Sequence, residues 1–235
     1  YLASGRKYRS ARQLADVLLP RGVGVIASNG SVYELQSGLA VERIAAGPLE
    51  LAYRRMGEIG ASLFLFGLER TYYTRDLPSY FLEEDRARLV AGRESSLIQI
   101  SGPSDLRAYA HDIVNGIVIE EGNPALLEEA RSALSGIAGI TISSSASNNI
   151  ELYAPHTGKS SAIRRVCADL GIGIDRVMAF GDGFNDIDML ECVGKGVAMG
   201  NAPAEVRRCA RYVTKRNSEC GIAWFLENGR TGESK

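Results

Sequence analysis

The chain has 235 residues, 45% of them hydrophobic and 23% charged, which is enough for one large or two modest domains with a sizeable hydrophobic core. Its 27 lysines and arginines nearly balance its 28 aspartates and glutamates, so the net charge of −1 excludes a bulk attraction to nucleic acid or to anionic membranes. No apolar run reaches the roughly 18 residues that a membrane-spanning helix requires.

The first 37 residues alternate between strand and helix patterns. Residues 1–3 resemble the end of a strand whose beginning is outside the printed sequence. Apolar residues at helical spacing predict an amphipathic helix over 10–19, which proline and glycine then end. A short apolar run predicts a buried strand at 23–27, and Asn29-Gly30 predicts a tight turn into a returning strand at 32–35.

Residues 38–148 mix helix and strand patterns without long linkers, which predicts a compact α+β insertion. Helices are predicted at residues 49–59, 82–90, 104–111 and 124–134, and strands at residues 62–66, 71–74, 97–100, 117–120 and 140–143. Glycine, serine and asparagine cluster at residues 143–149, and we interpret this cluster as a hinge.

The last 87 residues follow an α/β pattern with short buried strands between helices, typical of a parallel sheet. Strands are predicted at residues 149–153, 177–180, 196–199 and 212–214, and helices at residues 160–170, 205–210 and 221–227.

Four cysteines stand at positions 167, 192, 209 and 220, without a Cys-x-x-Cys pair and without histidines at zinc-finger spacing. This pattern is typical of reduced thiols in a cytosolic protein. The printed residues also contain no recognisable signal peptide. We therefore expect a cytoplasmic protein, monomeric or homodimeric, that binds neither nucleic acid nor a membrane.

Residues 177–190 are the most informative stretch of the chain. An apolar strand is followed by a Gly-Asp-Gly turn and then by an apolar-periodic helix. The loops at the carboxyl ends of parallel strands are where α/β proteins bind ligands, and this loop carries Asp182, Asn185 and Asp186. Oxygen ligands on one tight loop favour Mg²⁺, which in such a place indicates phosphate chemistry. The alternative is an ordinary turn with Asp186 at a helix start.

Lys159 opens a predicted helix, so its ammonium and the helix amino end would face the same place and could hold an anionic phosphate. A nucleotide P-loop is excluded because that motif needs glycine five residues before Gly158, where Tyr153 stands. The only histidines, His111 and His156, have no serine or cysteine elbow nearby, so no hydrolytic triad is visible.

Together, several separate segments resemble the haloacid dehalogenase-like superfamily, and most closely its Cof-type phosphatases. These segments are Ser4-Gly5-Arg6, Ser28-Asn29-Gly30, Lys159, residues 181–190 and residues 196–202. The resemblance implies an α/β fold with a Rossmann-like parallel-sheet core, formed by residues 1–37 and 149–235. It also implies an inserted α+β cap domain at residues 38–148. The implied activity is Mg²⁺-dependent hydrolysis of phosphate monoesters of small metabolites such as sugar phosphates.

The same resemblance implies roles for individual residues. Ser4 would hold the transferring phosphoryl group, and Lys159 would steady the phosphate and the nucleophile. Asp182 and Asp186 would bind Mg²⁺, which makes Asp182 catalytic, with the Asn185 amide beside them. The remaining positions that correspond to residues lining the cleft are Gly5, Arg6, Asn29 and Asn201.

One part of the family pattern is missing from the printed residues. The family uses an Asp nucleophile and an acid/base Asp in a D-x-D-G-T motif on a central first strand. The only D-x-D here, Asp186-Ile187-Asp188, is inside the magnesium loop and cannot serve. We therefore expect an N-terminal segment, outside the printed chain, to carry the nucleophile of an aspartyl-phosphate intermediate. The alternatives are a phosphomannomutase-like phosphotransferase and a truncated, inactive module that binds phosphate and Mg²⁺.

Overall fold

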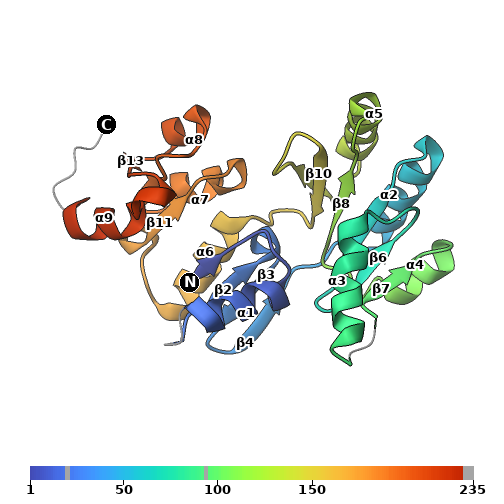
Figure 1. Ribbon diagram of the computed structural model, residues 1–235, viewed down its shortest axis with the longest axis horizontal. Coiled ribbons are helices and arrows are strands. Elements are labelled where there is room, and N and C mark those ends of the chain that lie inside the picture. Colours follow the sequence, from blue (N-terminus) through green and yellow to red (C-terminus); the bar gives the residue numbers. More distant parts are fainter. Residues whose placement is uncertain (19–21, 93–94, 230–235) are drawn as a thin grey trace. The chain divides into compact units, whose positions relative to one another are not determined.

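The computed structural model describes residues 1–18, 22–92 and 95–229 (Figure 1). The chain divides into two compact units. The core unit contains Tyr1–Arg6, Leu14–Ala40 and the chain from Gly158 onward. The insertion unit contains Lys7–Gln13 and Val41–Thr157. Helix α1 (Tyr8–Leu18) is shared between them, and residue 19 of the predicted helix lies outside the described residues.

The core unit contains two sheets. The first has the order β1-β2-β3-β4, with β1 (Leu2–Ala3), β2 (Val25–Ala27), β3 (Val32–Leu35) and β4 (Gly38–Val41). The second has the order β11-β12-β13, with β11 (Met178–Gly181), β12 (Lys195–Ala198) and β13 (Tyr212–Val213). The strands of the second sheet are parallel, β1 is parallel to β2, and β2 and β3 form the predicted hairpin. Strand β4 was not predicted, because half of it is exposed and it lacks an apolar alternation.

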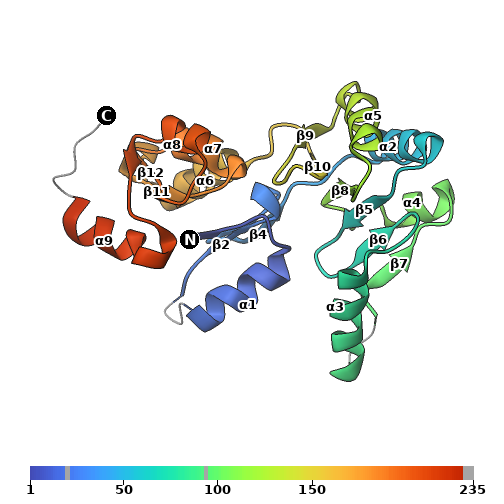
Figure 2. The same cartoon turned by 45° about the horizontal axis from the view of Figure 1, so that its top comes forward.

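The other helices of the core unit are α6 (Lys159–Leu170), α7 (Ile187–Cys192), α8 (Ala204–Cys209) and α9 (Gly221–Asn228). Figure 2 shows α6, α7 and α8 gathered around β11 and β12. The helical spacing of Ala162, Ile163 and Val166 places them on one face of α6, where they pack in a cluster with Leu190 and Ala198. This packing fixes the start of α6 beside the end of β11.

An apolar cavity of about 410 Å³ lies between the two sheets of the core unit. Its lining includes Leu2 and Ala3 of β1, Met178 to Phe180 of β11, and Ile163 of α6. Within the described residues, β1 pairs only with β2 and β11 pairs only with β12. Two strand edges with unused backbone hydrogen-bonding groups therefore border the cavity.

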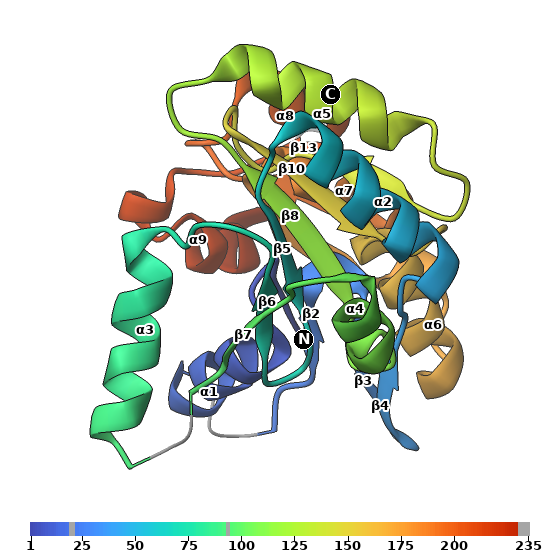
Figure 3. The ribbon, with the colours of Figure 1, turned by 90° about the vertical axis from the view of Figure 1, so that its right-hand side faces the viewer.

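The insertion unit is built on a sheet with the order β7-β6-β5-β8-β10-β9. Its strands are β5 (Leu63–Phe66), β6 (Thr71–Tyr73), β7 (Leu97–Gln99), β8 (Asn115–Ile119), β9 (Thr141–Ser143) and β10 (Asn149–Tyr153). Its helices are α2 (Ala46–Ile59), α3 (Ser79–Val90), α4 (Pro103–Tyr109) and α5 (Pro124–Ser135). The predicted elements of this region are thus confirmed within a few residues. Helices α2, α4 and α5 pack against one face of the sheet (Figure 3).

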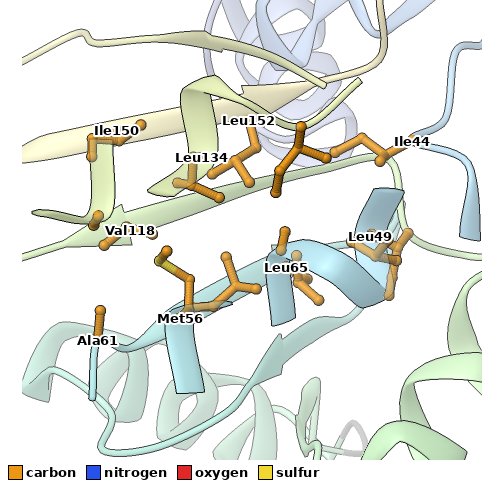
Figure 4. Close-up of a cluster of buried hydrophobic side chains, with 14 of the residues drawn as sticks. Ile44, Leu49, Met56, Ala61, Leu65, Val118, Leu134, Ile150 and Leu152 are labelled. Carbon is orange, nitrogen blue, oxygen red and sulfur yellow. The ribbon is translucent and has the colours of Figure 1, made fainter. Parts of the chain in front are cut away.

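The period-2 alternation of the strands separates the two faces of this sheet. Leu65 points into the buried hydrophobic cluster between this sheet and helices α2, α4 and α5, together with Leu49 and Met56 of α2 (Figure 4). The neighbouring Phe64 points to the opposite face, where its ring centroid lies 5.3 Å from that of Phe81 of α3. The fold class is therefore confirmed as an α/β protein with a parallel-sheet core and an α+β insertion.

Two sequence-based expectations for the end of the insertion differ from the structure. The predicted boundary at 148/149 is too early, because β10 pairs with β8 and β9 and the insertion unit runs to Thr157. The predicted hinge at residues 143–149 is the loop of the β9–β10 hairpin. The side chain of Asn149 closes this loop by accepting hydrogen bonds from the backbone N–H groups of Ser145 and Ala146, at 3.1 and 3.3 Å.

The Tyr72→Phe variant should lower the free energy of unfolding by about 1–3 kcal/mol. Tyr72 is fully buried, and its hydroxyl donates to Asp112 Oδ2 at 2.7 Å. Burial, followed by this contact with Asp112, raises the pKa of the tyrosine, so the hydroxyl keeps its proton as donor. Urea unfolding measures the loss. The Tyr53→Phe variant is the control and should change stability by less than about 0.5 kcal/mol; an equal loss in both would contradict the assigned hydrogen bond.

Candidate active site

A polar cleft of about 410 Å³ opens in the core unit where β1 and β11 end. Its lining residues are Ala3, Ser4, Gly5, Lys159, Phe180, Gly181, Asp182, Asn185, Asp186, Met199, Asn217 and Ile222. Most of the residues predicted for the site from the sequence therefore line one cleft. They come from three distant parts of the chain, namely the end of β1, the start of α6 and the end of β11, which the fold brings together.

A buried ion pair forms the floor of the cleft. Lys159 Nζ lies 2.5 Å from Asp186 Oδ1, and the two side chains are only 4% and 9% exposed. The second carboxylate oxygen of Asp186 accepts hydrogen bonds from the backbone N–H groups of Asp182 and Gly183, at 2.9 and 3.0 Å. Asp186 therefore fixes both the shape of its own loop and the position of the lysine ammonium.

Asp182 is held from a neighbouring loop. Asn201 donates its Nδ2 to Asp182 Oδ2 at 3.0 Å and accepts at Oδ1 from the backbone N–H of Asn217, also at 3.0 Å. Both ends of the Asn201 amide are therefore engaged inside the core unit, and Asn201 does not itself line the cleft. Asn217 does line it, although the sequence offered no sign of this, because a loop asparagine belongs to no motif.

Asn185 is oriented by Asn29, whose Oδ1 accepts from Asn185 Nδ2 at 2.9 Å. The turn that presents Asn29 is strained, since Ser28 and Asn29 have φ values of 48° and 50° in the left-handed region. Non-glycine residues held in this conformation cluster at functional sites. Asn29 was predicted to line the cleft. In the structure it contacts Asn185, which lines the cleft, but Asn29 itself is outside the lining.

The segment Ser4-Gly5-Arg6 reaches the cleft only in part. Ser4 and Gly5 line it, whereas the exposed side chain of Arg6 is outside the lining. Ser4 Oγ accepts a hydrogen bond from the backbone N–H of Arg6 at 3.1 Å, and Ser4 N donates to the carbonyl of Ile26 at 2.8 Å. These bonds orient the serine hydroxyl, which retains its hydrogen for an oxygen in the cleft.

The oxygen donors in the cleft fit Mg²⁺. In the described part of the chain, no three carboxylate, thiol or imidazole side chains gather into a cation site. Asp182 and Asp186 supply two carboxylates, and Asn185, whose Nδ2 is committed to Asn29, supplies an amide oxygen. Mg²⁺ usually keeps several waters and binds through one or two carboxylates together with substrate phosphate. These residues could therefore hold Mg²⁺.

The cysteines lie outside this cleft. Burial raises the pKa of the Cys167 and Cys192 thiols, which disfavours the reactive thiolate. Both histidines are also outside its lining. Among the described residues, no helix is both long and apolar enough to span a membrane.

Residues 1–226 match the sequence profile of the haloacid dehalogenase-like hydrolases. The chain belongs to this family. The family suggested by the separate motifs is thereby confirmed. One solved member, a haloacid dehalogenase-like hydrolase from B. subtilis, is 25% identical and superposes with a TM-score of 0.76, covering 96% of this chain and 86% of that structure.

Two curated proteins show closer local similarity. A putative phosphatase of Haemophilus influenzae is 47% identical over 88 residues, 37% of this chain and 34% of that protein. The 5-amino-6-(5-phospho-D-ribitylamino)uracil phosphatase YcsE of Bacillus subtilis is 43% identical over 84 residues, 36% of this chain and 34% of that protein. The matched region spans about a third of the length of these two relatives.

A Gly30→Ala variant should lower the free energy of unfolding by about 2–4 kcal/mol. Gly30 has a φ of +96°, and a Cβ there would stand 2.1 Å from the carbonyl oxygen of Gly158, the residue before Lys159. Chemical denaturation measures the loss. The control is Gly22→Ala, which shares a positive φ of +77° but has open space around it. Gly22→Ala should lower the free energy of unfolding by only about 1–2 kcal/mol, the cost of placing alanine in a left-handed backbone conformation. Equal losses of stability in the two variants would show that the close approach of Gly30 to Gly158 is unimportant.

Proposed function

We propose that the protein is a Mg²⁺-dependent phosphatase that hydrolyses phosphate monoesters of small metabolites such as sugar phosphates. The observation that carries this proposal is the convergence on one cleft of the buried Lys159–Asp186 pair, the Ser4 hydroxyl and the Asp182 carboxylate. Ordinary turn chemistry would not require a lysine from a different helix to be buried against the turn.

The groups in the cleft meet the demands of phosphoryl transfer, which needs neutralisation of charge on the equatorial oxygens and an in-line nucleophile. Lys159 places an ammonium at the amino end of α6, where the helix dipole also favours an anion. Ser4 can donate its hydroxyl to a phosphoryl oxygen. Mg²⁺, when bound by Asp182, Asp186 and Asn185, would supply further stabilisation of negative charge.

The proposed reaction passes through an aspartyl-phosphate whose nucleophile is not among the printed residues. In the part of the chain that the structure describes, β1 and β11 each have one edge that pairs with no other strand, which supports a further strand between them. The apolar cavity that these edges border shares Ala3, Phe180 and Ile222 with the polar cleft. A parallel strand in this cavity would deliver a carboxylate from its carboxyl end to the region of Lys159.

Substrate choice is proposed to depend on the insertion, predicted as a cap at residues 38–148. Support for the substrate class comes from the YcsE relative, by name a phosphatase of a phosphorylated ribitylamino-uracil.

The test is phosphate release by the full-length protein from a panel of phosphorylated metabolites, with Mg²⁺ and with a chelator. Release that requires Mg²⁺ is the expected result. Transfer of phosphate to a second sugar rather than to water would instead indicate a phosphomannomutase-like phosphotransferase. Binding of Mg²⁺ and inorganic phosphate without any turnover would contradict the phosphatase and indicate a binding module.

A further inference from the structure

At the start of α6, Ser161 Oγ accepts a hydrogen bond from the backbone N–H of Gly158 at 3.0 Å, so this local contact holds the residue before the helix and not the first N–H groups of the helix. The N-cap residue is Gly158, which has no side chain to accept from the first N–H groups of the helix. Instead, the backbone N–H of Ser160, the second residue of α6, donates to Asp188 Oδ2 at 3.1 Å. Asp188 stands in the first turn of α7, so the cap is supplied by another helix.

The side chain of Asp188 is exposed, and two hydrogen bonds hold its carboxylate at the start of α6. Its other oxygen accepts from the backbone N–H of Met189 at 2.8 Å, which fixes the orientation of the group. A Cβ at position 158 would stand 2.7 Å from Asp188 Oδ2, so a side chain there would displace the carboxylate from its present position. On its other side, the Gly158 carbonyl lies against Gly30. The start of α6 is therefore held between the turn at Ser28-Asn29-Gly30 and helix α7.

Lys159 is the first residue of α6, so whatever fixes the start of this helix also fixes the lysine. Its ammonium contacts Asp186, and its chain neighbour Ser160 contacts Asp188. Asp186 and Asp188 both belong to the segment that runs from the loop after β11 into α7. Asp188 itself does not line the cleft, so any effect on phosphate must pass through another residue.

We propose that Asp188 is a positioning residue that caps α6 from α7 and thereby fixes Lys159 in the phosphate-binding cleft. This inference rests on the proposed function. It also assigns a role to the second carboxylate of the D-x-D sequence, which the motif comparison left without one.

Positioning and simple electrostatics predict opposite signs for the loss of Asp188. A negative charge near the cleft repels phosphate, so if charge were its only effect, any neutral substitution would strengthen phosphate binding. If Asp188 positions Lys159, Asp188→Ala weakens binding because the cap is lost. Asp188→Asn retains an acceptor oxygen of the same shape, and asparagine caps helices about as well as aspartate.

The experiment has two parts on the full-length protein in saturating Mg²⁺. A calorimetric titration with inorganic phosphate measures phosphate affinity, and a phosphate-release assay measures kcat. Asp188→Ala should weaken phosphate binding and lower kcat by roughly tenfold, less than the roughly 100-fold that a misplacement of about 1 Å can cost. Asp188→Asn should stay within about twofold of the wild type. Glu191→Ala, on the same helix, is the matched control and should change neither quantity.

Combining Asp188→Ala with Lys159→Met tests whether the two residues act as one unit. In the Lys159→Met background, Asp188→Ala should cause no further loss of phosphate affinity, because residues that act through each other are not additive. A merely structural role would instead give additive losses. Additive losses, or stronger phosphate binding by Asp188→Ala, would overturn the proposal.

A second measurement is independent of turnover and of the lysine variant. Amide hydrogen exchange at Ser160, followed by NMR, should accelerate roughly fivefold to tenfold in Asp188→Ala, as expected for a lost helix cap, but not in Asp188→Asn. Unchanged exchange in Asp188→Ala would overturn the capping role. Absence of turnover in the wild type, with the exchange result as expected, would refute only the phosphatase.

Discussion

Asp182→Asn is expected to reduce Mg²⁺-dependent phosphate release by the full-length protein at least about 100-fold, because even replacement of outer-shell groups at metal sites costs about 10–100-fold. The amide is neutral and is a poorer ligand for a hard cation. The exposed side chain of Asp182 contacts Asn201 Nδ2 through an oxygen that asparagine retains, so the fold should survive.

Turnover measured across a range of Mg²⁺ concentrations, together with circular dichroism, checks this expectation. Glu227→Gln neutralises an exposed carboxylate on α9 of the same unit and should leave turnover unchanged. Wild-type turnover in Asp182→Asn would refute the assignment of Asp182 as a magnesium ligand.

Lys159→Met should lower the free energy of unfolding by about 3–5 kcal/mol, the typical cost of removing one partner from a buried ion pair. The methionine leaves the carboxylate of Asp186 buried with its two backbone N–H donors but without its counter-charge. Adding Asp186→Asn to Lys159→Met removes the uncompensated charge, so the double variant should recover part of the lost stability.

Urea unfolding without Mg²⁺ measures both variants. Lys195→Met removes an exposed lysine at the start of β12 and should change stability by less than about 0.5 kcal/mol. A loss below about 1 kcal/mol in Lys159→Met would mean that the pair behaves like an exposed surface salt bridge. The role of Asp186 as the fixed floor of the cleft would then be wrong.

The sequence by itself determined most of the secondary structure and the chemistry of the magnesium loop. Both depend on local information: apolar spacing shows which face of a helix or strand is buried, and glycine next to a carboxylate marks a tight polar turn. The run Gly181-Asp182-Gly183 follows a buried strand in the structure as the pattern predicts. Lys159 likewise opens the predicted helix and faces the same cleft as this loop.

Only the tertiary structure decided how the polar side chains divide between lining the cleft and supporting it. Asn29 and Asn201 hold Asn185 and Asp182 from behind, whereas Asn217, in no motif, lines the cleft. Hydrogen bonds between residues far apart in sequence follow from how the strands and helices pack, and no local pattern records them.

The end of the insertion was decided in the same way. The strand at Asn149–Tyr153 was predicted with the right ends, yet its partners β8 and β9 place it in the insertion unit. A strand's alternation shows which of its faces is buried but carries little information about which edge it joins, because backbone pairing is nearly independent of side-chain identity. The sequence therefore established the strand, and tertiary pairing decided the unit to which it belongs.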